Sequence, residues 1–248
     1  MRVICIIPAR YESTRFPGKP LADLCGKPMI QHVYDRVLKA KTVSYVAVAT
    51  DDERIFEAVQ RFGGQAIMTS ERHRSGTDRI AEAVSKLDLS DTDVVVNIQG
   101  DQPIFEPAQI DEVAKPLLDD LTIPMSTLIY KIARKKEITH PNAVKVVFDK
   151  DHFAVYFSRA TIPYVRDKGS KVSYYKHHGI YAYRSSFLGT FTRLSEGVLE
   201  RQEALEQLRA IEHGYRIKVV ETLYDSVEVD TPQELKRVRC LIKNSHAL

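Results

Sequence analysis

Cysteine is scarce in this 248-residue sequence, and neither a long apolar run nor a strong excess of one charge is present. The three cysteines lie far apart and form no CxxC pair, which argues against a disulfide framework or a thiolate zinc site and favours a reducing cytoplasm. No apolar stretch approaches the roughly 20 residues that span a bilayer, so no membrane insertion is expected. The net charge of +3 is small and argues against a general nucleic-acid binder.

Two familiar glycine signatures are also missing. The sequence contains no GxGxxG, which excludes the dinucleotide-binding fingerprint, and no GxxxxGK[ST], which excludes the Walker A loop. Any nucleotide site must therefore be built differently. No linker rich in Pro, Gly or Ser divides the chain, so residues 1–248 are expected to form a single domain with two closely joined halves, 1–124 and 125–248.

Hydrophobic periodicity predicts an α/β fold. In the first half, buried-type strands alternate with amphipathic helices, which predicts stacked βαβ units and a mostly parallel sheet. In the second half, strands follow one another closely, and 199–215 reads as one long amphipathic helix. Asp230 is well placed as the N-cap of a closing helix. The expected strands are 3–9, 43–50, 65–69, 93–101, 125–132, 142–150, 153–159 and 216–222, with helices at 28–40, 54–62, 75–87, 109–120, 199–215 and 231–244.

Positive charge is concentrated at the start of the chain. Residues 1–41 carry eight basic and three acidic side chains, a net +5, which leaves −2 for the other 207 residues. Arg10, Arg15 and Lys19 lie in a Pro- and Gly-containing loop directly after the first buried strand. Ligands of open α/β sheets bind beyond the carboxyl ends of the strands, so these cations are candidates for binding phosphate. A solvated basic loop is the alternative.

Further candidates follow at other loops. Asp101 comes just after the fourth strand and could hold Mg²⁺ against phosphate oxygens, or simply cap a loop. Ser75 and Gly76 open a helix, where free N–H groups suit phosphate, ribose or a base edge, although a plain helix cap explains them equally well. Considered alone, Asp230 reads as a helix cap and not as a metal ligand.

A set of ordered motifs makes the chain resemble a known family. The loop at 9–20 is similar to the first motif of sugar-activating cytidylyltransferases with a GT-A-like fold. Further motifs resemble the branch of 3-deoxy-D-manno-octulosonate (KDO) cytidylyltransferases, and together they span almost the whole chain. They are HRSGTDRIAE (73–82), VVVNIQGDQP (94–103), PNAVKVVFD (141–149), YFSRATIPY (156–164), HHGIYAYR (177–184), LEQLR (205–209) and VDTPQELKRV (229–238).

The resemblance implies a fold, a reaction and partners. The fold would be a Rossmann-like, GT-A-type sheet flanked by helices, with a smaller mixed α/β part for sugar binding and dimerisation. CTP and KDO would give CMP-KDO and pyrophosphate with Mg²⁺ as cofactor, in the cytoplasm, activating the sugar for lipopolysaccharide synthesis. Relatives are homodimers, and segment 150–195, rich in Tyr and Phe, is a candidate contact. No nucleic-acid partner is expected.

The resemblance also implies residue roles. Catalysis would fall to Arg10, Lys19, Asp101 and Asp230, of which the two aspartates would bind the metal. CTP would be held by Arg10, Arg15, Lys19, Ser75, Gly76, Gln99 and Asp101. The sugar acid would be held by Lys145, Arg159, His177, Tyr181, Glu206 and Gln207, with Arg159 as the natural partner of its carboxylate.

Some questions stay open at this point. Gln102 stands where many relatives have glutamate, and His178 where they usually have leucine. These departures leave room for an 8-amino KDO analogue or a sialic-type acid as acceptor. A nucleotide-binding regulator without catalysis is a further alternative. No base for the sugar hydroxyl is singled out, because a metal-bound hydroxyl needs none and a lone His177 is more often structural.

Overall fold

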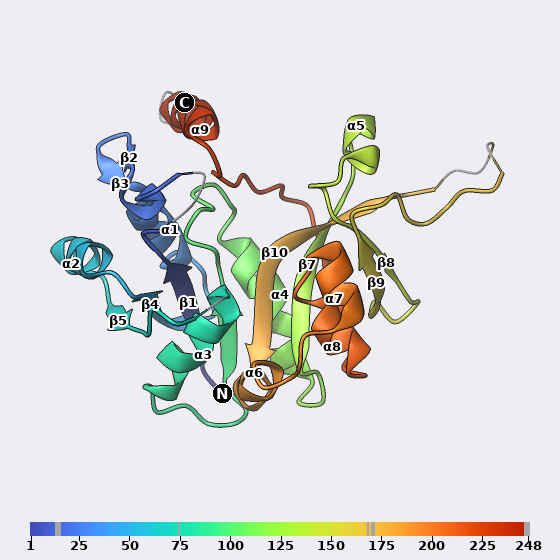
Figure 1. The fold of residues 1–248 in the computed structure, drawn as a ribbon, viewed down its shortest axis with the longest axis horizontal. Coiled ribbons are helices and arrows are strands. Elements are labelled where there is room, and N and C mark those ends of the chain that lie inside the picture. Colours follow the sequence, from blue (N-terminus) through green and yellow to red (C-terminus); the bar gives the residue numbers. More distant parts are fainter. Residues whose placement is uncertain (13–15, 74, 168, 170–171, 246–248) are drawn as a thin grey trace.

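The structure is a computed structural model that describes all residues except 13–15, 74, 168, 170–171 and 246–248, together with the side chains of 244 and 245. One nine-stranded sheet runs through both halves of the chain (Figure 1). Seven of its strands follow the order β11-β7-β10-β6-β1-β4-β5, and β8 and β9 extend it beside β10. The strands are β1 Val3–Ala9, β4 Val43–Thr50, β5 Ala66–Met68, β6 Val94–Asn97, β7 Met125–Lys131, β8 Lys145–Phe148, β9 Ala154–Ser158, β10 Tyr175–Arg184 and β11 Ile217–Thr222, and a separate hairpin joins β2 Asp23–Leu24 to β3 Lys27–Pro28.

The sheet register brings several strand ends to one edge. Strand β1 pairs in parallel with β4 and β6, so that Ile6 lies opposite both Ala47 and Asn97. Strand β10 is antiparallel to both β6 and β7, while β11 returns parallel to β7. The mostly parallel sheet predicted from the sequence is confirmed, with β10 as the strand that reverses direction.

Helices cover both faces of this sheet. The helices are α1 Met29–Val37, α2 Glu53–Arg61, α3 Gly76–Ser85, α4 Ala108–Asp119, α5 Lys135–Thr139, α6 Ser185–Phe191, α7 Val198–Glu203, α8 Leu208–Glu212 and α9 Pro232–Ser245, with a 3₁₀ turn at Lys19–Leu21. Apolar side chains of α1, α2 and α4 pack on one face, and those of α3, α6 and α8 pack on the other. Within the described residues, no helix is both long and apolar enough to cross a membrane.

The predicted helix at 199–215 is wrong, because the chain breaks into α7 and α8. Ala204 adopts a left-handed φ of 50°, which ends α7. The carboxylate of Glu212 accepts hydrogen bonds from the N–H groups of Leu199 and Glu200, at 2.9 and 3.0 Å. A continuous helix would hold residues 199 and 212 roughly 20 Å apart at about 1.5 Å per residue. These hydrogen bonds therefore require the two short helices to fold back on each other.

Helix α9 is the last element, and it does not pack on the main sheet core. Its apolar side chains Leu235, Val238 and Ile242 contact Leu24 and Met29 near the start of the chain. The segment between β11 and α9 crosses the edge of the sheet to reach that position (Figure 1). Residues around 225–230 consequently lie over the strand ends, where the candidate site is found.

Candidate functional site

A polar pocket of about 260 Å³ opens at the carboxyl ends of β1 and β6. Its walls come from five separate segments of the chain, and most of the nucleotide-binding residues predicted from the sequence lie in it. Arg15 lies outside the described residues, so its role in binding CTP stays a prediction. The pocket is lined by Pro8, Ala9, Arg10, Lys19, Pro20, His73, Ser75, Gly76, Arg79, Gln99, Gly100, Asp101 and Asp230.

The basic loop after β1 is anchored by its own backbone and by helix α2. Gly18 N–H donates to the carbonyl of Tyr11 at 2.8 Å, which closes the loop just before Lys19. The guanidinium of Arg54 lies 3.3 Å from the centre of the Tyr11 ring, and Asp52 in turn binds Arg54 at 2.6 Å. A cation held over an aromatic face adds stability to such a loop. This contact could not be predicted from local sequence, because Tyr11 and Arg54 belong to different elements.

Lys19, Asp101 and Asp230 meet at the centre of the pocket. The ammonium Nζ of Lys19 lies 2.6 Å from Oδ2 of Asp101 and 3.3 Å from Oδ1 of Asp230. The N–H of Val229 donates to the carbonyl of Asp101 at 2.9 Å, which fixes the two acidic segments side by side. The structure thus brings together the two carboxylates that the resemblance assigns to one metal ion.

Gly100 explains how Asp101 reaches β1. A Cβ atom at this position would lie 2.9 Å from the carbonyl oxygen of Pro8, which is closer than real Cβ contacts allow. Glycine is therefore required for the turn after β6 to pack against the end of β1. The turn carries Gln99 and Asp101 into the pocket, and Gln99 is oriented by a hydrogen bond from its amide to Asn97 at 3.2 Å.

The prediction that Asp230 caps the last helix is corrected by the structure. The capping hydroxyl belongs to Thr231, which accepts from the N–H of Glu234 at 3.3 Å. The carboxylate of Glu234 reaches back to the N–H groups of Asp230 and Thr231, at 2.8 and 2.9 Å, which completes a capping box. Because Thr231 performs the capping, the Asp230 carboxylate can face Lys19.

The donor set of this cluster suits magnesium. Within the described part of the chain, no group of three or more His, Cys, Asp or Glu side chains is arranged to hold a metal. Asp101 and Asp230 provide two carboxylates, and magnesium commonly takes one or two protein carboxylates and fills its other positions with phosphate oxygens and water. Lys19 shows that a positive charge already fits between the two carboxylates.

One wall of the pocket is the start of α3. Ser75 caps this helix, and its hydroxyl accepts from the N–H of Asp78 at 3.1 Å. Gly76 packs close to Pro8, where an added Cβ would lie 3.4 Å from the proline ring. Arg79 is buried and fixed by Thr69 and Asp51, both at 2.6 Å. This arrangement leaves the pocket face of the helix start narrow and rigid.

The predicted sugar-binding residues His177 and Tyr181 lie on β10 beside this pocket. Nε2 of His177 lies 3.0 Å from the hydroxyl of Thr127, and the ring packs against Tyr181 at 5.2 Å between centres. Burial, and to a lesser extent the charge of His178, lower the pKa of His177 to about 3. The imidazole is consequently neutral near pH 7. Burial also raises the pKa of Tyr181, and Tyr183, Glu206 and Glu228 add to this effect.

Glu206 and Gln207 lie in the turn between α7 and α8, and not on a solvated helix face. Oε2 of Glu206 accepts from the hydroxyl of Thr77, and burial raises the pKa of this carboxyl. Oε1 of Glu206 and Nε2 of Gln207 are buried and have no hydrogen-bond partner among the described residues. Buried polar atoms without a hydrogen bond are uncommon. Oε1 of Glu206 has an ion-pair contact with Arg209 at 3.9 Å, and Nε2 of Gln207 could donate to a ligand.

A second polar opening lies next to this turn. It has a volume of about 520 Å³, and Ser75 lines both it and the central pocket. Glu206 and Arg209 lie on its far side. Glu206 therefore lines an opening that shares Ser75 with the central pocket.

Lys145 does not fit its predicted role as a sugar-binding residue. Its side chain is fully buried, and Nζ donates to the carbonyls of His140, Ala143 and Arg159 at 2.9, 2.6 and 2.7 Å. An ammonium group has three N–H donors, so all of them are used. The geometry assigns Lys145 a structural role in joining β8, β9 and the segment after α5.

Arg159 is partly committed in the same way. Its guanidinium donates to the carbonyls of Glu203, Pro141 and Ala204, at 2.6, 3.2 and 3.2 Å. Arginine has five N–H donors, so two are left over for a carboxylate. Its predicted role as partner of the sugar carboxylate stays a prediction.

Fold and pocket together define an α/β protein with a polyanion site at the strand ends, as in enzymes that transfer nucleotidyl groups. A family model described as cytidylyltransferase matches residues 4–218. The 3-deoxy-manno-octulosonate cytidylyltransferase of Syntrophus aciditrophicus (strain SB) is 72% identical over 241 residues, which is 97% of each chain. The 8-amino-3,8-dideoxy-manno-octulosonate cytidylyltransferase of Shewanella amazonensis (strain ATCC BAA-1098 / SB2B) is 51% identical, over 98% of this chain and 99% of the relative.

A solved structure is similar throughout. A CMP:2-keto-3-deoxy-manno-octonic acid synthetase complexed with CTP superposes with a TM-score of 0.93 at 44% identity, covering 99% of this chain and 100% of that one. This chain belongs to the cytidylyltransferase family and, within it, to the 3-deoxy-manno-octulosonate cytidylyltransferases. The resemblance inferred from the ordered motifs is confirmed.

The structural role of Lys145 can be tested by replacement with methionine. We expect Lys145→Met to lower the free energy of unfolding by about 2–4 kcal/mol, because three buried carbonyls lose their donor. The folded variant should keep kcat/KM within roughly threefold of the parent, since mutations away from reacting groups act mainly on stability. Urea denaturation and steady-state kinetics measure the two quantities. Lys150→Met on the exposed surface is the control, and a loss of turnover without loss of stability would restore the substrate role.

Proposed function

We propose that this protein transfers CMP from CTP to KDO, giving CMP-KDO and pyrophosphate, and so activates the sugar for lipopolysaccharide synthesis. The observation that carries the proposal is 72% identity to a 3-deoxy-manno-octulosonate cytidylyltransferase over 97% of both chains. The polar pocket at the strand ends supports it, because Lys19 and Arg10 line the same space as two acidic side chains.

The reaction requires little covalent chemistry from the protein. The 2-hydroxyl oxygen of the sugar forms a bond to the α-phosphorus of CTP, and the bond from that phosphorus to the β-phosphate oxygen breaks. The hydroxyl proton is lost, and pyrophosphate leaves with the bonding electron pair. Positioning and charge stabilisation dominate such reactions. Arg10 and Lys19, which line the pocket, would stabilise the charge that develops on pyrophosphate.

Magnesium is the proposed cofactor, with Asp101 and Asp230 as its protein ligands. Bound there, it would neutralise phosphate oxygens and lower the pKa of a coordinated hydroxyl. His177 is a poor candidate for the base, because its pKa of about 3 makes it a weak proton acceptor at neutral pH. This low pKa favours hydroxyl activation that needs no side-chain base.

Lys19 has two proposed roles. Without ligands it holds Asp101 and Asp230 together, at 2.6 and 3.3 Å. With CTP its ammonium would turn to the phosphates and leave both carboxylates to the metal. Binding of nucleotide and metal would therefore favour each other, since each changes the state of the same lysine.

A homodimer in the cytoplasm is also proposed. Strands β8 and β9 and the outer part of β10 project from the end of the sheet (Figure 1). Val155 and Tyr164, from this projecting part, are 57% and 88% exposed. Large exposed apolar side chains on one projection suit a contact between copies. The three cysteines are free thiols, which agrees with a reducing compartment.

Asp101→Asn tests the reaction and the metal role together. We expect the rate of pyrophosphate release from CTP and KDO to fall about 100-fold or more, because loss of a group that stabilises transition-state charge has effects of this size. Thermal unfolding should change little. Asp91→Asn, on the exposed surface, serves as the matched control. Absence of pyrophosphate release by the unmodified protein with magnesium, CTP and KDO would sink the proposed function and favour a non-catalytic regulator.

Lys19→Met separates the two roles of the lysine without an activity readout. We expect Mn²⁺ to bind roughly threefold to tenfold more tightly in the absence of nucleotide, because a partly exposed ion pair worth about 1 kcal/mol no longer competes. CTP should bind at least about tenfold more weakly in the presence of metal, since a charge-assisted contact is lost. Titration calorimetry measures both. Weaker Mn²⁺ binding in the variant would show that Lys19 supports the metal and does not compete with it.

Sedimentation tests the oligomeric state. We expect the protein at micromolar concentration to sediment at about twice its 28.2 kDa chain mass. Tyr164→Glu should shift it towards the monomer, because a charge in an apolar contact is costly to desolvate. Leu121→Asp, at another exposed apolar position, should leave the dimer intact. A monomer at every concentration would end the proposal.

A further inference from the structure

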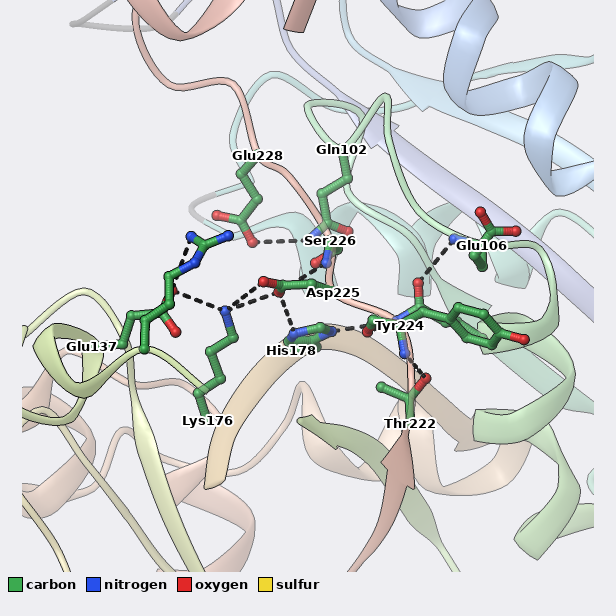
Figure 2. Close-up of polar contacts among 12 residues, drawn as sticks. Gln102, Glu106, Glu137, Lys176, His178, Thr222, Tyr224, Asp225, Ser226 and Glu228 are labelled. Atoms are coloured by element: carbon green, nitrogen blue, oxygen red, sulfur yellow. Dashed lines mark hydrogen bonds and ion pairs between the residues drawn. The ribbon is translucent and has the colours of Figure 1, made fainter. Parts of the chain in front are cut away.

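Glu228 and Gln102 form a pair beside the central pocket that the proposed reaction does not use. The segment that carries Glu228 pairs with the turn after β6, through the N–H of Val227 to Ile104 at 3.0 Å and of Val229 to Asp101 at 2.9 Å. This pairing places the two side chains together, and the amide Nε2 of Gln102 donates to Oε1 of Glu228 at 2.8 Å (Figure 2). A carboxylate accepts but does not donate, which fixes the orientation of the amide.

The pair faces the acceptor side of the site. A Cβ built on Gly179 of β10 would lie 3.8 Å from the Gln102 amide and 3.9 Å from the Glu228 carboxylate. Gly179 lies between His177 and Tyr181 in the same strand, and these are the side chains predicted to bind the sugar acid. His177 and Glu228 also line the same cleft. Glu228 is thus a wall of the acceptor region that the sequence motifs did not identify.

A cleft of about 490 Å³ continues from Glu228 and His177 towards Lys176 and Asp225. Asp225 there forms an ion pair with Lys176 at 2.9 Å, and its carboxylate lies 3.2 Å from Nε2 of His178 (Figure 2). His178, the residue predicted to differ from the leucine of relatives, therefore contacts Asp225. The cleft offers room for the part of an acceptor that points away from its reacting hydroxyl.

Glu228 differs from Asp225 in having no positive partner. Its side chain is accessible from the cleft, and no lysine, arginine or histidine of the described residues lies within ion-pair distance of it. The one side chain that binds it, Gln102, is neutral and completely buried. Asp101 and Asp230 add negative charge close by. An accessible carboxylate that has no protein cation can make a charge-assisted hydrogen bond to a ligand that supplies one.

We propose that Glu228, oriented by Gln102, is a specificity residue that binds an ammonium group on the acceptor, so that the enzyme uses an amino-substituted octulosonic acid as well as KDO. The inference rests on the proposed function and deepens it. An ammonium group makes a charge-assisted hydrogen bond to the carboxylate, and a hydroxyl at the same place makes a weaker neutral one. A site that hydrogen-bonds one substrate group discriminates against an analogue that lacks this group.

The test compares kcat/KM for KDO and for 8-amino-3,8-dideoxy-manno-octulosonate in the full-length protein. We expect Glu228→Gln to lower the ratio of kcat/KM for the 8-amino substrate to kcat/KM for KDO about tenfold or more. The change should come mainly from KM for the 8-amino substrate. Turnover of KDO should fall less, because its hydroxyl loses only a weaker neutral hydrogen bond. Glu57→Gln, an exposed glutamate on α2, removes the same charge far from the cleft and should leave the ratio unchanged.

Gln102 provides an independent arm of the experiment. Gln102→Met removes the amide that orients Glu228, and we expect it to lower the same ratio of kcat/KM values by less than Glu228→Gln does. The ratio for Glu228→Asp should lie between those of these two variants. Three results would overturn the inference and leave the proposed function standing. They are equal losses of kcat/KM on both substrates, an unchanged ratio in Glu228→Gln, and rejection of the 8-amino substrate by the unmodified protein. If the unmodified protein converts neither acid, the proposed function fails, and the inference fails with it.

Discussion

The ammonium of Lys19 between Asp101 and Asp230 is the interaction on which the site depends. Three segments far apart in the sequence meet there, and each is held in place by a separate device. The loop hydrogen bond between Gly18 and Tyr11 fixes the lysine, and the close approach of the Gly100 turn to β1 fixes the first aspartate. Opposite charges in contact stabilise each other, so one ammonium stabilises both carboxylates at once.

The parts of the structure that could be predicted are those that local sequence determines. Val3–Ala9 and Val43–Thr50 are continuous apolar runs, as expected for parallel strands buried on both faces, and both are found as strands. The loops after them carry the polar residues, and the rule that ligands bind beyond strand ends located the pocket. Ser75 caps α3 as the sequence indicated. The resemblance to the family came from the same local motifs.

The parts that could not be predicted depend on contacts across the fold. Periodicity made 199–215 a single helix, because the hydrogen bonds from residues 199 and 200 to Glu212 leave no trace in a hydrophobic pattern. The resemblance implied that Lys145 binds the sugar acid, and only the folded chain surrounds its ammonium with three carbonyls. In the same way, Thr231 and Asp230 are both residue types that can cap a helix, and the hydrogen bonds of Glu234 show that Thr231 is the cap.

The role of Thr231 as helix cap has a consequence for the order in which the protein becomes active. Because Thr231 caps α9, the neighbouring aspartate is positioned only when this helix has formed and docked on Leu24 and Met29. During synthesis, the basic loop and the first aspartate leave the ribosome more than a hundred residues before Asp230. A nascent chain can therefore carry the basic loop and Asp101 while Asp230 is still missing, and the cluster of Lys19 with both carboxylates forms only after α9 has been made and docked.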